Sequence, residues 1–141
     1  MSNSYTKAFD EWNSAKKLAD ASDRQVFGYP REVWWCFLGV NIGAEIDGKN
    51  ENFERPIIIM RVYNKETMLV LPTTGRAKTD RFHFPIEIDA QNPETKESYK
   101  KTVYVKLTQA RVISNKRLVR KIDVISEENF EKIKNVFKDF T

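Results

Sequence analysis

Cysteine and histidine are almost missing from this sequence. The chain of 141 residues contains one cysteine, Cys36, and one histidine, His83. A single cysteine excludes a disulfide within the chain and is typical of proteins from a reducing compartment, so we expect a cytoplasmic location. The same scarcity leaves too few ligands for a zinc site. We therefore expect neither a bound metal nor another cofactor.

Long apolar runs are also absent. No stretch approaches the ~20 consecutive apolar residues that cross a bilayer, so we expect no contact with a membrane. Residues 1–20 are amphipathic and carry charges of both signs, which does not match a secretory signal peptide. Walker, Rossmann, zinc and serine-hydrolase motifs do not occur either. The length predicts one main domain with a core of ordinary size.

Positive charge is concentrated in one part of the chain. The formal net charge is only +4, but residues 71–121 contain 12 Lys and Arg against 5 Asp and Glu. A concentrated basic surface is typical of proteins that bind nucleic acids or acidic peptides. From charge alone, a solvated sheet face rich in Lys and Arg is an equally good interpretation.

The hydrophobic pattern predicts short strands between two helices. Apolar residues at helical spacing predict an amphipathic helix over residues 4–20, and a linker follows over 21–30. Aromatic and β-branched runs predict strands, and Ser126 is a plausible N-cap for a closing helix. The strands are expected at 32–38, 56–63, 67–71, 82–88, 103–107 and 110–113, with a polar hairpin tip over 89–101.

This order of elements predicts the fold class. Five or six short, mostly antiparallel strands with helices at both ends favour a mainly β protein built on a small, strongly bent sheet or partial barrel. Residues 1–24 are expected to form a helical extension, and residues 25–141 are expected to form the main domain.

Three polar residues are expected at the same edge of this sheet. Glu45 lies in a glycine-bearing loop, Arg55 opens the second strand and Thr74 ends the third. A carboxylate can take a proton from a ribose 2′-OH, and an arginine can stabilise the charge that develops on a phosphate. The set is therefore suited to phosphodiester chemistry. The alternative is that Arg55 makes an ordinary surface ion pair of little energetic value.

His83 alternates with two phenylalanines and therefore faces away from them. This position favours a histidine at the rim of the sheet or in solvent, with a catalytic role as the less favoured alternative.

Five short segments, in order along the chain, resemble the motifs of the MazF/PemK family of toxins. Lys116 to Ile122 and the closing helix extend the resemblance, which covers about residues 29–140. Each segment is weakly specific alone, whereas five in the family's order form a specific signal. The segments are 31–39 (REVWWCFLG), 43–45 (GAE), 54–56 (ERP) with the aliphatic strand after it, 71–74 (LPTT) and 105–111 (VKLTQAR).

The resemblance implies both a fold and a function. The fold would be an SH3-like barrel of the type shared by CcdB and PemK toxins, assembled as a homodimer. The activity would be metal-independent cleavage of single-stranded RNA, which leaves a 2′,3′-cyclic phosphate and a 5′-OH. A cognate antitoxin would inhibit the toxin by covering its site.

The resemblance also implies roles for individual residues. Arg55 would stabilise the transition-state phosphate and could also protonate the leaving oxygen. Thr74 would hydrogen-bond to the phosphate, and Glu45 would be the base or would orient the base. Gln109 and Arg111 resemble structural or interface positions, although Arg111 is also among the groups expected to contact RNA. The other expected RNA contacts are Arg76, Lys78, Arg81 and His83.

Some residues depart from the family pattern and keep two alternatives open. Gly75 replaces a Ser or Thr that often follows the threonine motif, and Thr108 stands where Asp or Ser is common. One alternative is a non-catalytic toxin of the same fold that acts by binding a protein, as gyrase poisons do. The other is an inactivated member that only binds RNA or a partner.

The helical extension has an apolar face of its own. Tyr5, Phe9 and Trp12 recur at helical spacing. We expect this face to dock on a barrel, either that of the same chain or that of a dimer mate.

Overall fold

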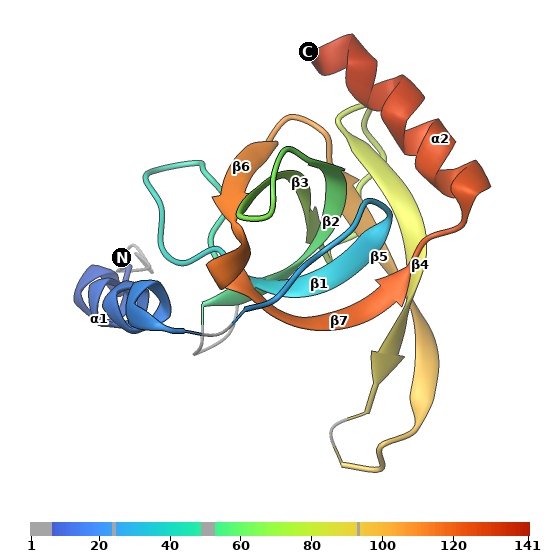
Figure 1. Cartoon of the computed structure of the whole chain (residues 1–141). Helices are drawn as coiled ribbons and strands as arrows, with labels where there is room; N and C mark the ends of the chain where they lie inside the picture. Colours follow the sequence, from blue (N-terminus) through green and yellow to red (C-terminus); the bar gives the residue numbers. More distant parts are fainter. Residues whose placement is uncertain (1–6, 24, 49–52, 93) are drawn as a thin grey trace, which may run out of the picture.

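Antiparallel pairing connects the strands in the computed structural model, which describes residues 7–23, 25–48, 53–92 and 94–141. In this described part, seven strands form one sheet in the order β4-β5-β3-β2-β1-β7, and β6 also pairs with β3 (Figure 1). The predicted mainly β class is confirmed, with more strands than expected. The strands are β1 (Glu32–Phe37), β2 (Glu54–Val62), β3 (Thr67–Thr74), β4 (His83–Gln91), β5 (Ser98–Lys106), β6 (Arg111–Ser114) and β7 (Leu118–Val124).

The sheet curls until its two end strands approach each other. β4 and β7 meet where the backbone N–H of Asp89 donates to Asp123 Oδ2 at 3.0 Å. Register irregularities between β1 and β7, and between β2 and β3, add to the bend as β-bulges do. The sheet is therefore a half-barrel, which confirms the predicted strongly bent antiparallel sheet.

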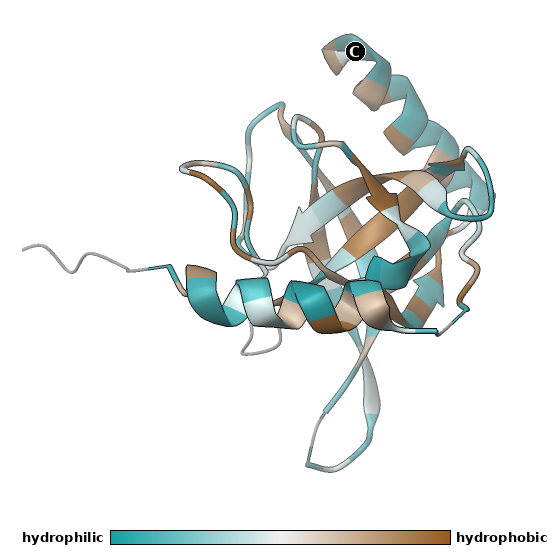
Figure 2. Ribbon diagram, turned by 60° about the vertical axis from the view of Figure 1, so that its left-hand side comes forward, coloured by the Kyte–Doolittle hydropathy of each residue, from teal (hydrophilic) through white to brown (hydrophobic). Residues whose placement is uncertain are grey.

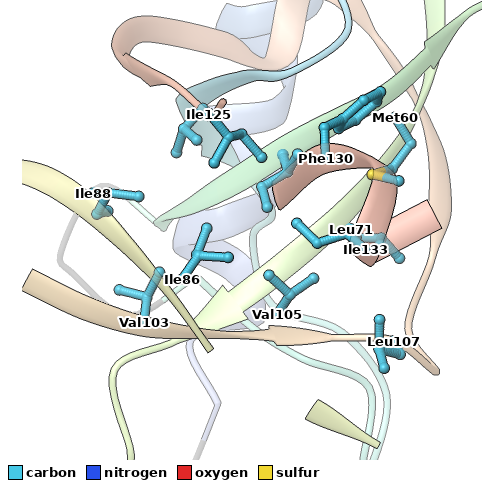
Figure 3. Packing of buried hydrophobic residues seen from close by; sticks show 12 residues of the cluster. Met60, Leu71, Ile86, Ile88, Val103, Val105, Leu107, Ile125, Phe130 and Ile133 are labelled. Atoms are coloured by element: carbon cyan, nitrogen blue, oxygen red, sulfur yellow. The ribbon is translucent and has the colours of Figure 1, made fainter. Parts of the chain in front are cut away.

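The central strand β2 is buried on both faces. Ile58 and Met60 belong to one hydrophobic cluster, and Ile57 and Ile59 belong to another. Burial on both faces explains why this strand is a continuous apolar run in the sequence instead of an alternating one. Figure 3 shows the first cluster, in which side chains from the strands pack together with Phe130 and Ile133 of the C-terminal helix.

The C-terminal helix α2 (Glu127–Phe137) begins and packs as the sequence predicts. Ser126 is its N-cap, and the serine side chain accepts a hydrogen bond from the N–H of Asn129 at 3.2 Å. Ile133 is fully buried against the inside of the curl. A short 3-10 turn, η2 (Lys138–Phe140), continues the helix at the C-terminal end.

The N-terminal helix α1 (Phe9–Ala21) packs on its own chain through Trp12, whose ring contacts Gly39 after β1, Phe53 before β2 and Arg117 before β7. The predicted start at residue 4 lies outside the described residues, as does Tyr5. Trp12 is 5% exposed and its ring lies directly over Gly39, whereas Phe9 is 50% exposed. Figure 2 shows α1 alongside the sheet with hydrophilic residues over much of its surface. Of the two described residues of the predicted apolar face, Phe9 and Trp12, Trp12 is the one that is buried.

Gly39 is essential to this contact. Its φ is +76°, and a Cβ at this position would lie 1.9 Å from the Trp12 ring. Polar contacts hold the two ends of the helical segment. Lys116, in the 3-10 turn η1 (Asn115–Arg117), donates to the carbonyl of Asp20 at 2.6 Å, and Lys7 forms an ion pair with Asp47 at 3.2 Å.

The β4–β5 hairpin is longer than the sequence predicts. Residues 89–101 were expected to form a polar tip, but only residues 92–97 lie between the two strands. The outer part of the hairpin projects from the half-barrel, so its two faces carry polar side chains that hide the strand pattern (Figure 1). Asp89 and Lys100 are cross-strand partners there and form an ion pair at 2.6 Å.

Candidate functional site

A basic pocket lies where β2, β3 and β5 meet the loop between β1 and β2. It is a shallow hollow of about 370 Å³, and four of the residues that line it are cationic. We call it the basic pocket. Its lining residues are Ala44, Ile46, Arg55, Thr74, Arg76, Lys78, Lys106 and Gln109.

Arg55 is held in a fixed orientation at this pocket. Its Nε donates to the carbonyl of Asp47 at 2.7 Å, and its Nη1 donates to the carbonyl of Thr73 at 3.1 Å. Burial lowers the pKa of the Arg55 guanidinium, and the nearby Asp47 carboxylate opposes that shift. Because an arginine side chain remains protonated in proteins, the pocket contains a preoriented positive charge.

Thr73 and Thr74 have different surroundings because they face opposite sides of β3. The Thr73 hydroxyl donates to the carbonyl of Pro56 at 2.8 Å inside the sheet. Thr74 lines the basic pocket, and its Oγ1 accepts a hydrogen bond from the N–H of Arg76 at 3.3 Å. Since a hydroxyl group can accept and donate at once, Thr74 can still donate to a ligand. The structure thus brings Arg55 and Thr74 together.

Glu45 lines a neighbouring hollow, which we call the outer pocket. Its lining residues are Asn41, Ala44, Glu45, Ile46, Thr108, Gln109, Ala110 and Arg111. The Glu45 carboxylate accepts a hydrogen bond from the N–H of Ile42 at 3.0 Å and is exposed. This local turn directs the carboxylate back toward its own loop, so Glu45 is not among the residues that line the basic pocket. Arg111 lines the outer pocket as well, and its Nη1 donates to the carbonyl of Leu38 at 3.5 Å.

Gln109 lies between the two pockets and lines both of them. Its Oε1 accepts from the N–H of Ile46 at 2.7 Å, and its Nε2 donates to the carbonyl of Ala44 at 3.4 Å. These contacts hold the β1–β2 loop against the segment between β5 and β6, which agrees with the structural role expected of Gln109.

The expected RNA contacts are divided between different surfaces. Arg76 and Lys78 line the basic pocket. Arg81 instead lies over the rings of Phe82 and Phe140, with its guanidinium carbon 4.8 and 5.7 Å from the ring centroids. Arg81 is therefore not one of the residues that line the basic pocket.

His83 belongs to a chain of polar contacts that leads into the basic pocket. Its Nδ1 is 2.7 Å from Asp80 Oδ1, and its Nε2 is 3.3 Å from the Nζ of Lys106. The His83 side chain is only 11% exposed. The ring is therefore mostly covered instead of solvated, and it is hydrogen-bonded on both nitrogens.

Lys106 is the cationic residue of the basic pocket that the sequence analysis missed. The alternation of Val103, Val105 and Leu107 places Lys106 on the opposite face of β5, which was a usable signal. Its cross-strand partner is His83, and this pairing depends on the register of β4 and β5. Burial lowers the pKa of Lys106, and the positive charges of neighbouring cations lower it further.

The described residues contain neither a cluster of metal-binding side chains nor a helix that could span a membrane. In the described ranges, no group of three or more His, Cys, Asp or Glu side chains could hold a metal ion. None of the described helices has the length and apolar content needed to cross a membrane.

Solved structures of toxins share this fold. The Mycobacterium tuberculosis toxin MazF-mt6 has a TM-score of 0.56 and 13% sequence identity, over 78% of this chain and 95% of that chain. An endoribonuclease from a mycobacterial species, solved in complex with its cognate antitoxin, has a TM-score of 0.55 and 13% identity, over 80% of this chain and 93% of that chain. None of the curated protein sequences matches this chain significantly.

The family model for PemK-like, MazF-like toxins of type II toxin–antitoxin systems matches residues 29–141. This range includes all the strands and all the residues that line the basic pocket. The chain therefore belongs to the PemK-like, MazF-like family of toxins of type II toxin–antitoxin systems.

Proposed function

We propose that this protein is an endoribonuclease toxin that cleaves single-stranded RNA at the basic pocket. The observation that carries the proposal is the pairing of a preoriented Arg55 with the Thr74 hydroxyl in a hollow lined by further cations. An anionic phosphodiester is the ligand that such a set suits best. The family match and the likeness to a mycobacterial endoribonuclease support the same activity.

The proposed reaction is an attack of the ribose 2′-OH on the adjacent phosphate. Arg55 stabilises the negative charge that develops on the phosphate oxygens, and Thr74 donates a hydrogen bond to one of them. The products are a 2′,3′-cyclic phosphate and a 5′-OH. The reaction uses an internal nucleophile and cationic side chains, so we propose that it needs no metal ion.

Glu45 remains the proposed base, but its position sets a condition on where the 2′-OH can bind. Its carboxylate lies in the outer pocket and bonds to its own turn through Ile42. The proposal therefore requires that the 2′-OH lie on the side of the basic pocket that borders the outer pocket, or that this turn rearrange. Glu45→Gln should slow cleavage by ~10²–10⁴-fold if Glu45 is the base, and cleavage assays on purified protein would measure this. An unchanged rate would remove Glu45 from the mechanism.

We also propose two protein partners. The first is a cognate antitoxin, as in the mycobacterial complex of similar fold. The basic pocket would favour an acidic antitoxin segment that covers Arg76 and Lys78. The second is another copy of this chain, in the homodimer that the sequence resemblance implies. The proposed location of these complexes is the cytoplasm.

Cleavage of a defined oligonucleotide tests the proposed function. The purified protein should cut single-stranded RNA in the presence of EDTA. A matched oligonucleotide with one 2′-deoxy nucleotide on the 5′ side of the cleaved bond should remain intact, because it lacks the attacking hydroxyl group. Loss of cleavage in EDTA would overturn the metal-independent mechanism. A folded protein that cuts no RNA in cells or in solution would favour the toxin that acts by binding a protein.

A further inference from the structure

We infer that Lys106 is the general acid that protonates the leaving oxygen, and that Asp80 and His83 are positioning residues that hold it in place. The inference rests on the proposed ribonuclease function and names a residue set for the same site. Arg55, Thr74 and Lys106 line the same pocket. The proposed roles of Arg55 and Thr74 leave the hydrogen-bonded series Asp80–His83–Lys106 without a function.

The geometry of the three side chains assigns their protons. Asp80 Oδ1 is 2.7 Å from His83 Nδ1, so the ring nitrogen donates to the carboxylate. The lone pair of His83 Nε2 then accepts a hydrogen bond from the Lys106 ammonium at 3.3 Å. His83 and Lys106 are direct cross-strand partners in the β4–β5 ladder, so the backbone keeps them side by side.

The charges around Lys106 favour the release of its proton. Lys78 and Asp80 face it from the loop after β3, Arg55 from β2 and His83 from β4. Burial is the largest effect that lowers the pKa of Lys106, followed by Lys78 and then Arg55, while Asp80 raises it. A lysine with a lowered pKa is a stronger acid than an ordinary lysine.

Arg55 is less suited to donate this proton. A guanidinium group holds its proton more tightly than an ammonium group does. The two cations therefore have different roles: Arg55 stabilises the charge on the phosphate, and Lys106 donates the proton to the leaving oxygen.

The proton and electron balance of the step is simple. The 2′ oxygen forms a bond to phosphorus and releases its proton to a base, which is water or a carboxylate. The bond between phosphorus and the 5′ oxygen breaks, and its electron pair stays on that oxygen. The Lys106 ammonium donates a proton to the same oxygen, which becomes the 5′-OH. The neutral amine then takes a proton from water.

A sulfur substitution in the substrate tests the role of Lys106. In an oligonucleotide whose 5′ bridging oxygen is replaced by sulfur, the leaving thiolate needs no proton. Lys106→Met should cleave the oxygen substrate ~10²–10⁴-fold more slowly than the parent protein. On the sulfur substrate, the variant should match the parent to within a few-fold. An equal loss on both substrates would mean that Lys106 only attracts the phosphate, and it would overturn the inference.

Two further variants keep this test decisive. Lys106→Arg retains the charge but is a weaker acid, so it should also be slow on oxygen and fast on sulfur even if Lys106→Met does not fold. Lys132→Met is the matched control, because Lys132 is a surface lysine on α2 that pairs with Glu128. If the parent protein cuts neither substrate, the result rejects the proposed ribonuclease function. It is thereby distinguished from a result that rejects Lys106 as the acid.

His83 can be tested separately because it acts through Lys106. His83→Ala should lower kcat about tenfold, roughly the effect of one lost hydrogen bond, and should leave KM unchanged. This loss should disappear on the sulfur substrate, as it should for Asp80→Asn. A purely structural role of His83 would give the same loss on both substrates, and that result would overturn the positioning role.

Discussion

Arg55 combines partial burial, two backbone hydrogen bonds and a permanent charge. We expect Arg55→Ala to lower kcat by ~10²–10³-fold, because a preorganised charge on the phosphate is lost. Arg55→Lys should recover little, since an ammonium group cannot bond to both the Asp47 and Thr73 carbonyls in the same plane. Single-turnover cleavage by the two folded variants would measure this. A rate close to that of the parent for Arg55→Ala would show that the site lies elsewhere.

Thr73 and Thr74 form a natural pair of matched variants. Thr74→Val should slow cleavage by an amount equivalent to ~1.5–3 kcal/mol, since it loses a hydrogen bond to a charged group. Its unfolding free energy should change little. Thr73→Val leaves the buried carbonyl of Pro56 without its hydroxyl donor, and should lower the unfolding free energy by ~1–3 kcal/mol. A loss of stability in Thr74→Val together with slow cleavage by a stable Thr73→Val would contradict the side-chain directions in β3.

Cys36 predicts a dependence of stability on pH. Burial raises the pKa of its thiol to about 12, whereas an unfolded cysteine titrates near ~8.5. Because the folded pKa is the higher one, this contribution to stability is complete below ~pH 8.5 and is lost as the pH rises toward the folded value. The unfolding free energy should therefore fall by up to ~1.4 kcal/mol per pH unit between about pH 9 and pH 11. Denaturant titrations of the parent and of Cys36→Ala should differ in this slope, and equal slopes would contradict the prediction.

At the scale of elements, the docking of α1 depends on one large side chain and one glycine. Removing residues 1–24 should lower the unfolding free energy by roughly 1–3 kcal/mol, because Trp12 loses its buried position. An unchanged melting temperature would mean that the helix contributes nothing to this fold and is available to another partner.

Gly39→Ala should have a comparable effect in the full chain, since the new methyl group would overlap the Trp12 ring. Gly43→Ala is a close control. Gly43 also has a positive φ, but a Cβ there would meet nothing within 4 Å. Thermal melts of both variants, with and without residues 1–24, would separate backbone strain from the clash. The clash should disappear once the helix is removed.

The elements with a clear hydrophobic face were predictable, and the polar ones were not. The Ser126 cap and the apolar stripe of α2 depend on neighbours within one or two turns, which a sequence shows directly. The β4–β5 hairpin extends past the core into solvent, so its strands lose the alternating pattern on which the prediction relied. The hydrophobic pattern of β3 stops at Leu71, whereas the strand continues to Thr74 because Thr73 and Thr74 pair with β5, far along the chain.

At the scale of the whole molecule, RNA binding should depend on salt. The basic pocket has four cations, and a single-strand site with about 3–5 phosphate contacts predicts a slope of roughly −2 to −3.5 in a plot of log affinity against log salt concentration. Fluorescence titrations with a non-cleavable 2′-deoxy oligonucleotide would measure it. Replacing Lys78 should reduce the slope, while replacing Lys132 on α2 should not. A slope near zero would exclude an electrostatic site.

The homodimer stays a prediction at this scale. Val112 on β6 and Val124 on β7 are 56% and 43% exposed, so apolar side chains remain at the surface of the half-barrel. We expect light scattering at tens of micromolar to give twice the mass of 16.5 kDa. A monomeric mass at that concentration would contradict the dimer.

The sequence by itself determined the fold class, the closing helix and the presence of Arg55 and Thr74 at one sheet edge. Those features follow from local periodicity, capping and the order of short motifs along the chain. Only the tertiary structure decided which side chains meet. The turn at Ile42 directs Glu45 into the outer pocket, and strand register places Lys106 beside His83. The alternation within β5 indicates which face Lys106 occupies, but it does not identify the residue opposite Lys106, which depends on how the whole β4–β5 hairpin pairs.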